Sequence, residues 1–274
     1  MRLGYNTNGF AHHTLEDAID ILAELGYQAI ALTPDVHHLH PFSTSTAELR
    51  RLRARLEASR LAVVIETGAR FVLDPRRKHR PNLLEKEPEG RQKRLHFLLR
   101  CTEIAAELGA PVVSIWSGQK PPETSDAEAR DFLRHGIHTL CDRAAALGIR
   151  IAFEPEPGMW IASLRQWEEL RDDVAHPALG LTLDTGHVPC TETISPADAI
   201  RRHLPELLNV HLDDARGGVH EHLQIGEGEL DWPSILRALQ DFQGVASVEL
   251  SRHSHDAPRA AATAIRKLRE FSPA

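Results

Sequence analysis

The feature that most constrains the fold is a repeat. A short apolar run followed by an amphipathic helical segment occurs eight times along the chain. The runs are rich in Val, Ile and Leu on both faces, which is typical of parallel strands covered by helices. Thr14 can cap the first helical segment and Gly26 can end it. Eight such units in 274 residues predict an α/β fold, a closed (β/α)8 TIM barrel, which takes about 250 residues. The predicted strands lie at residues 2–6, 28–33, 61–68, 111–116, 150–154, 179–184, 207–212 and 245–250.

Composition and charge limit the kinds of protein that this chain can be. Hydrophobic residues make up 42% of the chain and charged residues 26%, so a full core can be buried. No linker interrupts the repeat, and residues 1–274 are predicted to form a single domain. The net charge of −7 argues against nucleic acid as a partner. The three cysteines form no CxxC pair, and neither a signal peptide nor an apolar run of ~18 residues is present. We therefore expect a cytoplasmic protein without a membrane partner.

Four predicted strands end in side chains that can bind a metal ion. These strand ends are about one barrel unit apart, which is roughly 31 residues. Because the carboxyl ends of barrel strands meet at one rim, the four side chains are expected to converge there. Three buried carboxylates would repel one another, and a divalent cation offsets that repulsion. The expected metal ligands are Glu154 in IAFEPEPG, Asp184 in LTLDTGH, His211 in NVHLDD and Glu249 in SVELSRH.

The motifs LTLDTGH, NVHLDD, HEHLQIGEGELDW and SVELSRH occur in this order. Together they resemble the xylose isomerase-like TIM-barrel superfamily, and in particular its sugar phosphate isomerase and epimerase branch. The resemblance covers nearly the whole chain, with the first half matched mainly by pattern and the second half by specific motifs. It implies that one divalent ion, Mn²⁺, Mg²⁺, Co²⁺ or Zn²⁺, is held by the four strand-end residues. It also implies that His187 and Arg216 contact oxygens of a small carbohydrate-like substrate.

The resemblance implies isomerisation or epimerisation of a sugar-like polyol or keto acid. Such a reaction removes a proton next to a carbonyl and passes through an enediolate, whose charge a metal ion stabilises. Glu154 and Glu249 are the expected acid–base pair on opposite sides of the reacting carbon. Trp116 could form an apolar wall, and His220 and His222 could touch the substrate.

Two other activities are alternatives. The same enediolate could expel a neighbouring hydroxyl group, which would make the chain a metal-dependent lyase or dehydratase. The apurinic-site endonucleases of the superfamily are phosphoesterases, and they carry additional zinc ligands in a segment that HEHLQIGEG resembles. Those enzymes also have histidines after the third and fourth strands, where this chain reads ETGARF and SIWSGQ. This departure and the acidic net charge favour the sugar enzymes.

Several candidates also have a structural explanation. Asp184 could stabilise the turn at Thr185-Gly186 through its backbone amides, and His211 could be a core histidine. Glu156 shares the strand parity of Glu154 and is a rival ligand. Glu66, at the end of the third predicted strand, is expected to be structural.

The surface histidines, two basic residues and the oligomeric state each allow more than one interpretation. The histidines of residues 37–40 and 253–255 are expected to be polar surface, with a weak accessory metal site as the alternative. Lys78 and Arg80 are expected to be solvated, or to belong to a lid that binds an anionic substrate. Because related barrels often pair, a homodimer is one expectation.

Overall fold

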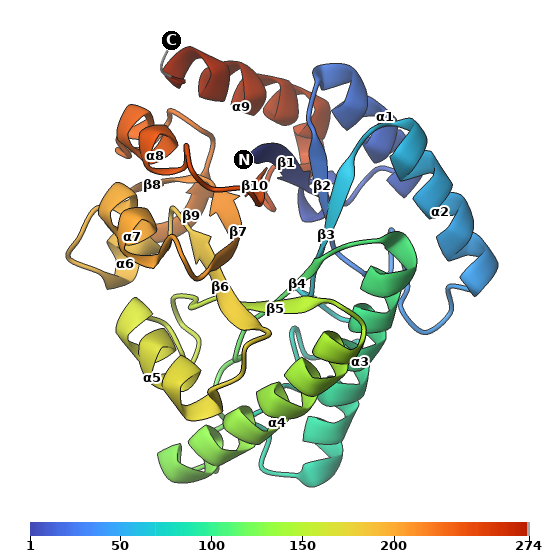
Figure 1. Cartoon of the computed structure of the whole chain (residues 1–274), viewed down its shortest axis with the longest axis vertical. Coiled ribbons are helices and arrows are strands. Elements are labelled where there is room, and N and C mark those ends of the chain that lie inside the picture. Colours follow the sequence, from blue (N-terminus) through green and yellow to red (C-terminus); the bar gives the residue numbers. More distant parts are fainter. Residues whose placement is uncertain (69, 273–274) are drawn as a thin grey trace.

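A closed barrel of eight parallel strands forms the centre of the molecule, and helices surround it (Figure 1). The computed structural model describes residues 1–68 and 70–272. The strand order is β1-β10-β7-β6-β5-β4-β3-β2, and β1 closes the barrel by pairing with both β10 and β2. The predicted TIM barrel is confirmed. The barrel strands are β1 (Arg2–Asn6), β2 (Ala29–Leu32), β3 (Ala62–Glu66), β4 (Val112–Ile115), β5 (Arg150–Phe153), β6 (Leu179–Asp184), β7 (Leu207–Leu212) and β10 (Val245–Val248).

The helices begin and end where local side chains satisfy the free backbone groups. Thr14 caps the first helix by accepting a hydrogen bond from the Asp17 amide at 3.1 Å. Gly26 ends the same helix in the left-handed conformation, with φ of +86°. Both helix signals predicted from sequence are confirmed. The helices are α1 (Leu15–Leu25), α2 (Thr46–Ala58), α3 (Pro88–Leu108), α4 (Asp126–Ala146), α5 (Leu164–Val174), α6 (Val188–Thr191), α7 (Pro196–His203), α8 (Trp232–Ala238) and α9 (Ala257–Phe271).

A short antiparallel hairpin follows β7 and was not predicted. It consists of β8 (Asp214–Arg216) and β9 (Val219–Leu223). The two residues between the strands, Gly217 and Gly218, have φ of +59° and +68°. Two positive φ values in a two-residue loop match the twist of a hairpin, and glycine adopts them without strain.

The barrel interior changes from apolar to polar towards one rim. Side chains two residues apart on a strand face the same side. The side that carries Glu154 therefore also carries Ala152, and Glu249 follows Ser247 and Val245. A small apolar cluster lies apart from the main core, and Ser114 and Thr182 hydroxyls lie 2.9 Å from each other. The cluster consists of Ala29, Ala31, Val64, Val112, Ala152, Leu208 and Val245.

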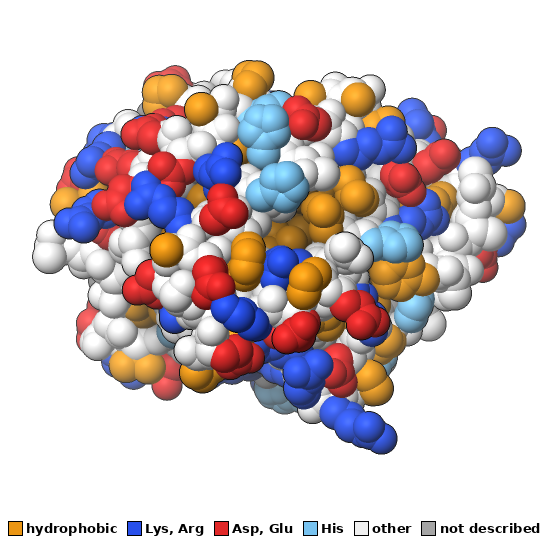
Figure 2. Space-filling model, turned by 90° about the horizontal axis from the view of Figure 1, so that it is seen from below, with side chains coloured by type: hydrophobic (Ala, Val, Ile, Leu, Met, Phe, Trp, Pro, Cys, Tyr) orange, Lys and Arg blue, Asp and Glu red, His pale blue; other side chains and the backbone are white. Residues whose placement is uncertain are grey.

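The outer surface in Figure 2 is seen from the side where α3 and α4 lie in Figure 1. Acidic and basic side chains are interleaved there, and neither sign forms a continuous patch on this face. No helix within residues 1–68 and 70–272 combines the length and the apolar character that crossing a bilayer requires.

Candidate metal centre

The four strand-end side chains named above lie together at one rim of the barrel. Glu154 directly follows β5, Asp184 ends β6, His211 lies near the end of β7, and Glu249 directly follows β10. The strand register places Asp184 beside His211. The four ligand atoms all lie within 4.8 Å of one another. Three of the side chains are buried, and the Glu249 side chain is 15% exposed.

The His211 ring is the centre of this group. Its Nδ1 atom lies 3.0 Å from Glu154 Oε1, 2.8 Å from Glu249 Oε2 and 3.9 Å from Asp184 Oδ2. Its Nε2 atom lies 3.0 Å from Glu66 Oε1. Nε2 thus faces one carboxylate, to which it can donate its proton, whereas Nδ1 faces three. A cation among these three carboxylates would replace the Nδ1 proton and be ligated by the Nδ1 lone pair.

Burial and like charges make this arrangement electrostatically unfavourable by itself. Burial raises the pKa of Asp184 well above its usual range, and Asp213 and Glu154 raise it further. Burial also raises the pKa of Glu154, although His211 partly offsets it. Burial opposes a charged His211, but the surrounding carboxylates outweigh burial and raise the pKa of this ring well above its usual value. Burial likewise opposes a charged Glu249, yet His211 lowers the pKa of this carboxyl.

The donor set fits a divalent cation. Within the described residues, the buried Oδ2 atom of Asp184 accepts no hydrogen bond. It lies 3.9 Å from His211 Nδ1 and 3.9 Å from His187 Nε2. Carboxylate oxygens with one imidazole nitrogen suit ions such as Mn²⁺, Mg²⁺, Co²⁺ and Zn²⁺. Glu154, Asp184, His211 and Glu249 are therefore the residues that could hold such an ion.

The turn after β6 orients Asp184. Its Oδ1 atom accepts hydrogen bonds from the amides of Gly186 at 2.7 Å and His187 at 2.9 Å. A Cβ atom at Gly186 would lie 2.5 Å from Asp213 Oδ1, so only glycine fits without a shift. One oxygen of Asp184 thus stabilises the turn, as its structural explanation predicts, while the other faces the site.

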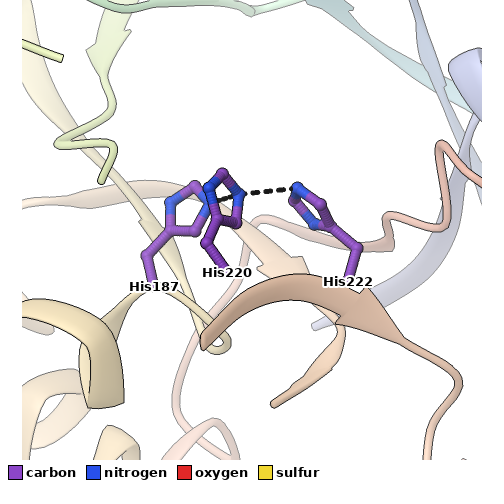
Figure 3. A group of neighbouring side chains, drawn as sticks. All are labelled: His187, His220 and His222. Atoms are coloured by element: carbon purple, nitrogen blue, oxygen red, sulfur yellow. Dashed lines mark hydrogen bonds between the residues drawn. The ribbon is translucent and has the colours of Figure 1, made fainter. Parts of the chain in front are cut away.

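A row of three histidines borders the metal ligands (Figure 3). His187 follows β6, and His220 and His222 belong to β9. The Nε2 atom of His220 lies 2.9 Å from His187 Nε2 and 2.8 Å from His222 Nε2. Asp213 Oδ2 lies 2.5 Å from His222 Nδ1. The row joins the turn after β6 to the β8–β9 hairpin.

The three histidines differ in charge. Burial lowers the pKa of His187 to about 3, and the neighbouring His222 contributes to this shift. Burial and His222 also lower the pKa of His220 to about 4. Burial acts in the same direction on His222, but Asp213 outweighs it and raises the pKa of His222 to about 9. At neutral pH the row therefore offers two neutral rings and one cation.

A cavity of about 170 Å³ opens above these groups. A space of this size holds several water molecules and is large enough for a small molecule. Its walls include His187, His220, His222 and Trp116. The Trp116 ring meets the His79 ring edge to face, with 5.1 Å between centroids. All four residues were expected from the sequence to contact the substrate, and they line one space.

Arg216 does not lie with them. It ends β8, where it pairs with Val219 across the hairpin turn, and its side chain is exposed. Its guanidinium donates a hydrogen bond to the carbonyl oxygen of Glu227. The hairpin, which was not predicted, turns Arg216 away from the cavity.

Three further residues in the cavity were given no site role from the sequence. Glu66 was expected to be structural, but its carboxylate holds His211 and accepts a bond from Asn209 at 2.8 Å. Asn8 donates a hydrogen bond to Glu249 Oε1 at 2.7 Å. Thr33 also lines the cavity. The strand-end position of Glu66 is a usable sequence signal, whereas Asn8 stands in a short 3-10 helix (Thr7–Phe10) without a motif.

The remaining histidines have other surroundings. His38 Nε2 lies 3.2 Å from the Phe10 carbonyl oxygen and 3.1 Å from that of His13, which ties two loops together. His253 and His255 line a separate surface pocket. Within residues 1–68 and 70–272, neither histidine cluster belongs to a group of side chains close enough to share a metal ion.

Known proteins resemble this chain over almost its full length. A family model described as xylose isomerase-like TIM barrel matches residues 19–271. An uncharacterised protein of Methanocaldococcus jannaschii, MJ1311, is 26% identical over 261 residues, which cover 91% of this chain and 83% of the relative.

Two solved structures show the same fold. A D-allulose 3-epimerase from Methylomonas sp. has a TM-score of 0.80 and 20% identity, covering 99% of this chain and 98% of that one. The IolI protein, crystallised with a bound zinc atom, has a TM-score of 0.78 and 19% identity, covering 99% and 98%. The chain belongs to the xylose isomerase-like TIM barrel family.

Proposed function

We propose that the chain is a divalent-metal-dependent epimerase or isomerase that acts on a sugar-like ketose. The observation that carries this proposal is the convergence of three carboxylates on His211 Nδ1 at the carboxyl rim of the barrel. A bound divalent cation would supply Lewis-acid stabilisation of the charge that develops on a carbonyl oxygen when the adjacent C–H loses its proton.

The chain's own acid–base groups would be Glu154 and Glu249. They come from β5 and β10, which are separated in the barrel by β6 and β7. Both reach His211 Nδ1, so they approach the same centre from different strands. One carboxylate would remove the proton and the other would return it on the opposite face of the carbon. That exchange of sides is what inverts a stereocentre.

The histidine row and Trp116 would hold the substrate. Imidazole nitrogens of His187, His220 and His222 can donate to or accept from hydroxyl groups. Trp116 offers an apolar surface on the same cavity. Such a mixture of an aromatic wall and several polar groups suits a polyol, whose hydroxyls need partners and whose C–H faces do not. The similarity to the D-allulose 3-epimerase fold and to zinc-bound IolI supports this proposal.

The test joins metal content to proton exchange. Purified protein is analysed for bound metal, and a panel of ketoses is incubated with it in deuterated water. We expect one divalent ion per chain and deuterium at the carbon next to the carbonyl, together with an epimer or isomer. Three zinc ions with cleavage of an abasic oligonucleotide would instead select the phosphoesterase, and a dehydrated product the lyase.

The matched variant is Glu249→Gln, with exposed Glu107→Gln as the control. Gln cannot remove a proton, so Glu249→Gln should lower the exchange rate by at least about a hundredfold. Glu107→Gln should exchange at the wild-type rate. Full exchange by Glu249→Gln would contradict the acid–base assignment.

A further inference from the structure

Three cationic side chains stand at the mouth of the cavity. Arg70, Lys78 and Arg252 belong to its lining, and Lys78 and Arg252 are exposed. Within the part of the chain that the structure describes, none of the three forms an ion pair with a carboxylate. Two other arginines of the same loop do, since Arg77 lies 2.7 Å from Asp74 and Arg80 lies 2.8 Å from Glu85.

Hydrogen bonds to main-chain oxygens hold the segments that carry the three cations. The amide of His79 donates a hydrogen bond to the carbonyl oxygen of Arg70 at 2.6 Å. This bond closes a loop, and Arg70 and Lys78, the residue before His79, therefore lie together at its base. Arg70 Nη2 reaches the Asn8 carbonyl oxygen at 3.5 Å, and the Asn8 side chain binds Glu249. Arg252 follows Glu249 by three residues, and its Nη2 atom lies 3.3 Å from the His220 carbonyl oxygen.

The electrostatic effect of this rim is visible at His79. Burial, together with the positive charges of Lys78, Arg94 and Arg70, lowers the pKa of His79 to about 3. Arg94 is fully buried behind the wall, with its guanidinium 4.8 Å from the Trp116 centroid. Cationic side chains therefore gather on this side of the cavity, although the chain as a whole carries a net charge of −7.

The cavity thus has two different ends. Its lining includes four carboxyl groups, those of Glu66, Glu154, Glu156 and Glu249. Burial raises the pKa of Glu156 to about 8, although Lys78 acts in the opposite direction, so this carboxyl is largely neutral at pH 7. The mouth of the cavity holds the three cations, which form no ion pair within the described residues. A neutral sugar would leave the mouth cations without a partner, whereas a substrate with an anionic tail would bind them and keep its carbonyl head at the floor. The cations at the mouth thus favour the orientation in which the anionic tail lies at the mouth and the carbonyl head at the strand ends.

We infer that the substrate carries an anionic group, a carboxylate or a phosphate, which Arg70, Lys78 and Arg252 bind at the mouth of the cavity. The inference rests on the proposed function for the identity of the keto head. Recognition of the anion itself depends only on the rim and can be measured without turnover.

The test compares three ligands that share one head. D-fructose, D-fructuronate and D-fructose 6-phosphate differ at carbon 6, which carries a hydroxymethyl, a carboxylate or a phosphorylated hydroxymethyl group. Isothermal titration calorimetry with metal-loaded protein gives the three affinities. We expect at least one anionic ligand to bind about tenfold or more tightly than D-fructose. The anionic ligand that binds more tightly shows whether the site prefers a carboxylate or a phosphate. The two groups differ in charge, since a phosphate carries about −1.5 to −2 charges at pH 7.

Single variants assign the effect to the rim. Arg70→Gln, Lys78→Gln and Arg252→Gln should each weaken the anionic ligand by about three- to tenfold and leave D-fructose binding within about twofold. Arg70→Lys keeps the charge and should retain most of the preference. Arg77→Gln is the matched control, because Arg77 is paired with Asp74 in the same loop. Circular dichroism establishes that each variant is folded.

Equal affinities for the three ligands, no detectable binding of either anion, or equal weakening of neutral and anionic ligands in the rim variants would each overturn the inference. The deuterium-exchange assay separates this outcome from failure of the proposed function. Deuterium exchange into D-fructose without tighter binding of the anionic ligands would contradict only the inference about the anion. Tighter binding of an anionic ligand without exchange or epimerisation of any ketose would contradict only the proposed function.

Discussion

At the scale of single residues, the two nitrogens of His211 contact different groups. Nε2 is held by Glu66, and Nδ1 faces the carboxylates. A partner on the far side of a ligating imidazole fixes both its tautomer and its orientation. If His211 binds the proposed ion, Glu66 would therefore position this ring rather than act as an additional ligand.

The variant Glu66→Gln tests this role. Loss of the negative charge should lower the affinity for the metal ion by about ten- to a hundredfold, because outer partners of ligating histidines usually matter to that extent. Titration of the metal against a competing chelator measures the affinity directly, with Glu107→Gln as the control. Unchanged affinity would show that His211 is held without Glu66.

The turn glycine provides a second test at this scale. In Gly186→Ala the new Cβ atom would lie 2.5 Å from Asp213 Oδ1, so the turn that orients Asp184 must move. We expect a loss of about 1–3 kcal/mol in the free energy of unfolding, which is typical of overpacking, and weaker metal binding. Urea denaturation and a metal titration measure the two effects. Wild-type values of both would contradict the tight packing of this turn.

Individual residues also show where sequence reasoning succeeds and fails. The strand ends with Glu154, Asp184 and His211 were predicted because an ionisable group in an apolar strand is costly unless it has a task. Glu66 satisfied the same criterion, but a single carboxylate gives no hint of its partner. Asn8 could not be found, because its contact with Glu249 joins residues at opposite ends of the chain.

At the scale of elements, the β8–β9 hairpin determines which side chains reach the cavity. It directs His220 and His222 inward and Arg216 outward. The carboxylate of Asp214 anchors its base, accepting hydrogen bonds from the Gly226 amide and the Trp232 indole, both at 2.8 Å. The Gly217-Gly218 pair is a recognisable hairpin signal. The orientation of the hairpin on the barrel is a tertiary property that the pair does not encode.

Asp214→Asn should loosen this hairpin, because an amide cannot accept from all of the donors that Asp214 serves. We expect faster amide hydrogen exchange in β9 and the following loop, and a loss of about 1–3 kcal/mol in the free energy of unfolding. Hydrogen exchange followed by mass spectrometry localises the effect. Asp241→Asn, an exposed carboxyl between α8 and β10, is the control. Identical exchange in β9 of both variants would contradict the anchoring role.

At the scale of the whole molecule, the barrel could be predicted because its signal is repeated eight times, so errors at single strand ends do not change the count. The loops at the rim have no such redundancy. The segment between β3 and α3 takes its shape from contacts such as that between the His79 amide and the Arg70 carbonyl, which arise only in the folded chain. Ligand specificity belongs to these loops, and it is therefore the property least accessible from the sequence.

A bound ion should stabilise the entire barrel, because its proposed ligands come from four strands. Saturation at a hundred times Kd contributes about 2.7 kcal/mol to the free energy of unfolding, or about 5 to 10 °C in Tm for a chain of this size. Differential scanning calorimetry before and after chelation measures the shift. In Glu249→Gln the shift should be much smaller, while Glu107→Gln should retain it. An equal Tm with and without metal would contradict the four-strand site.

The contact between Asn8 and Glu249 has a consequence for synthesis. The first strand leaves the ribosome early, but it pairs with the strand that emerges among the last residues, and Asn8 contacts that strand's carboxylate. A nascent chain that stops before β10 lacks one of the four proposed ligands, Glu249, and one neighbour of β1. Tight metal capture should therefore begin only after the final strand has been translated, which makes ion uptake a late marker of maturation.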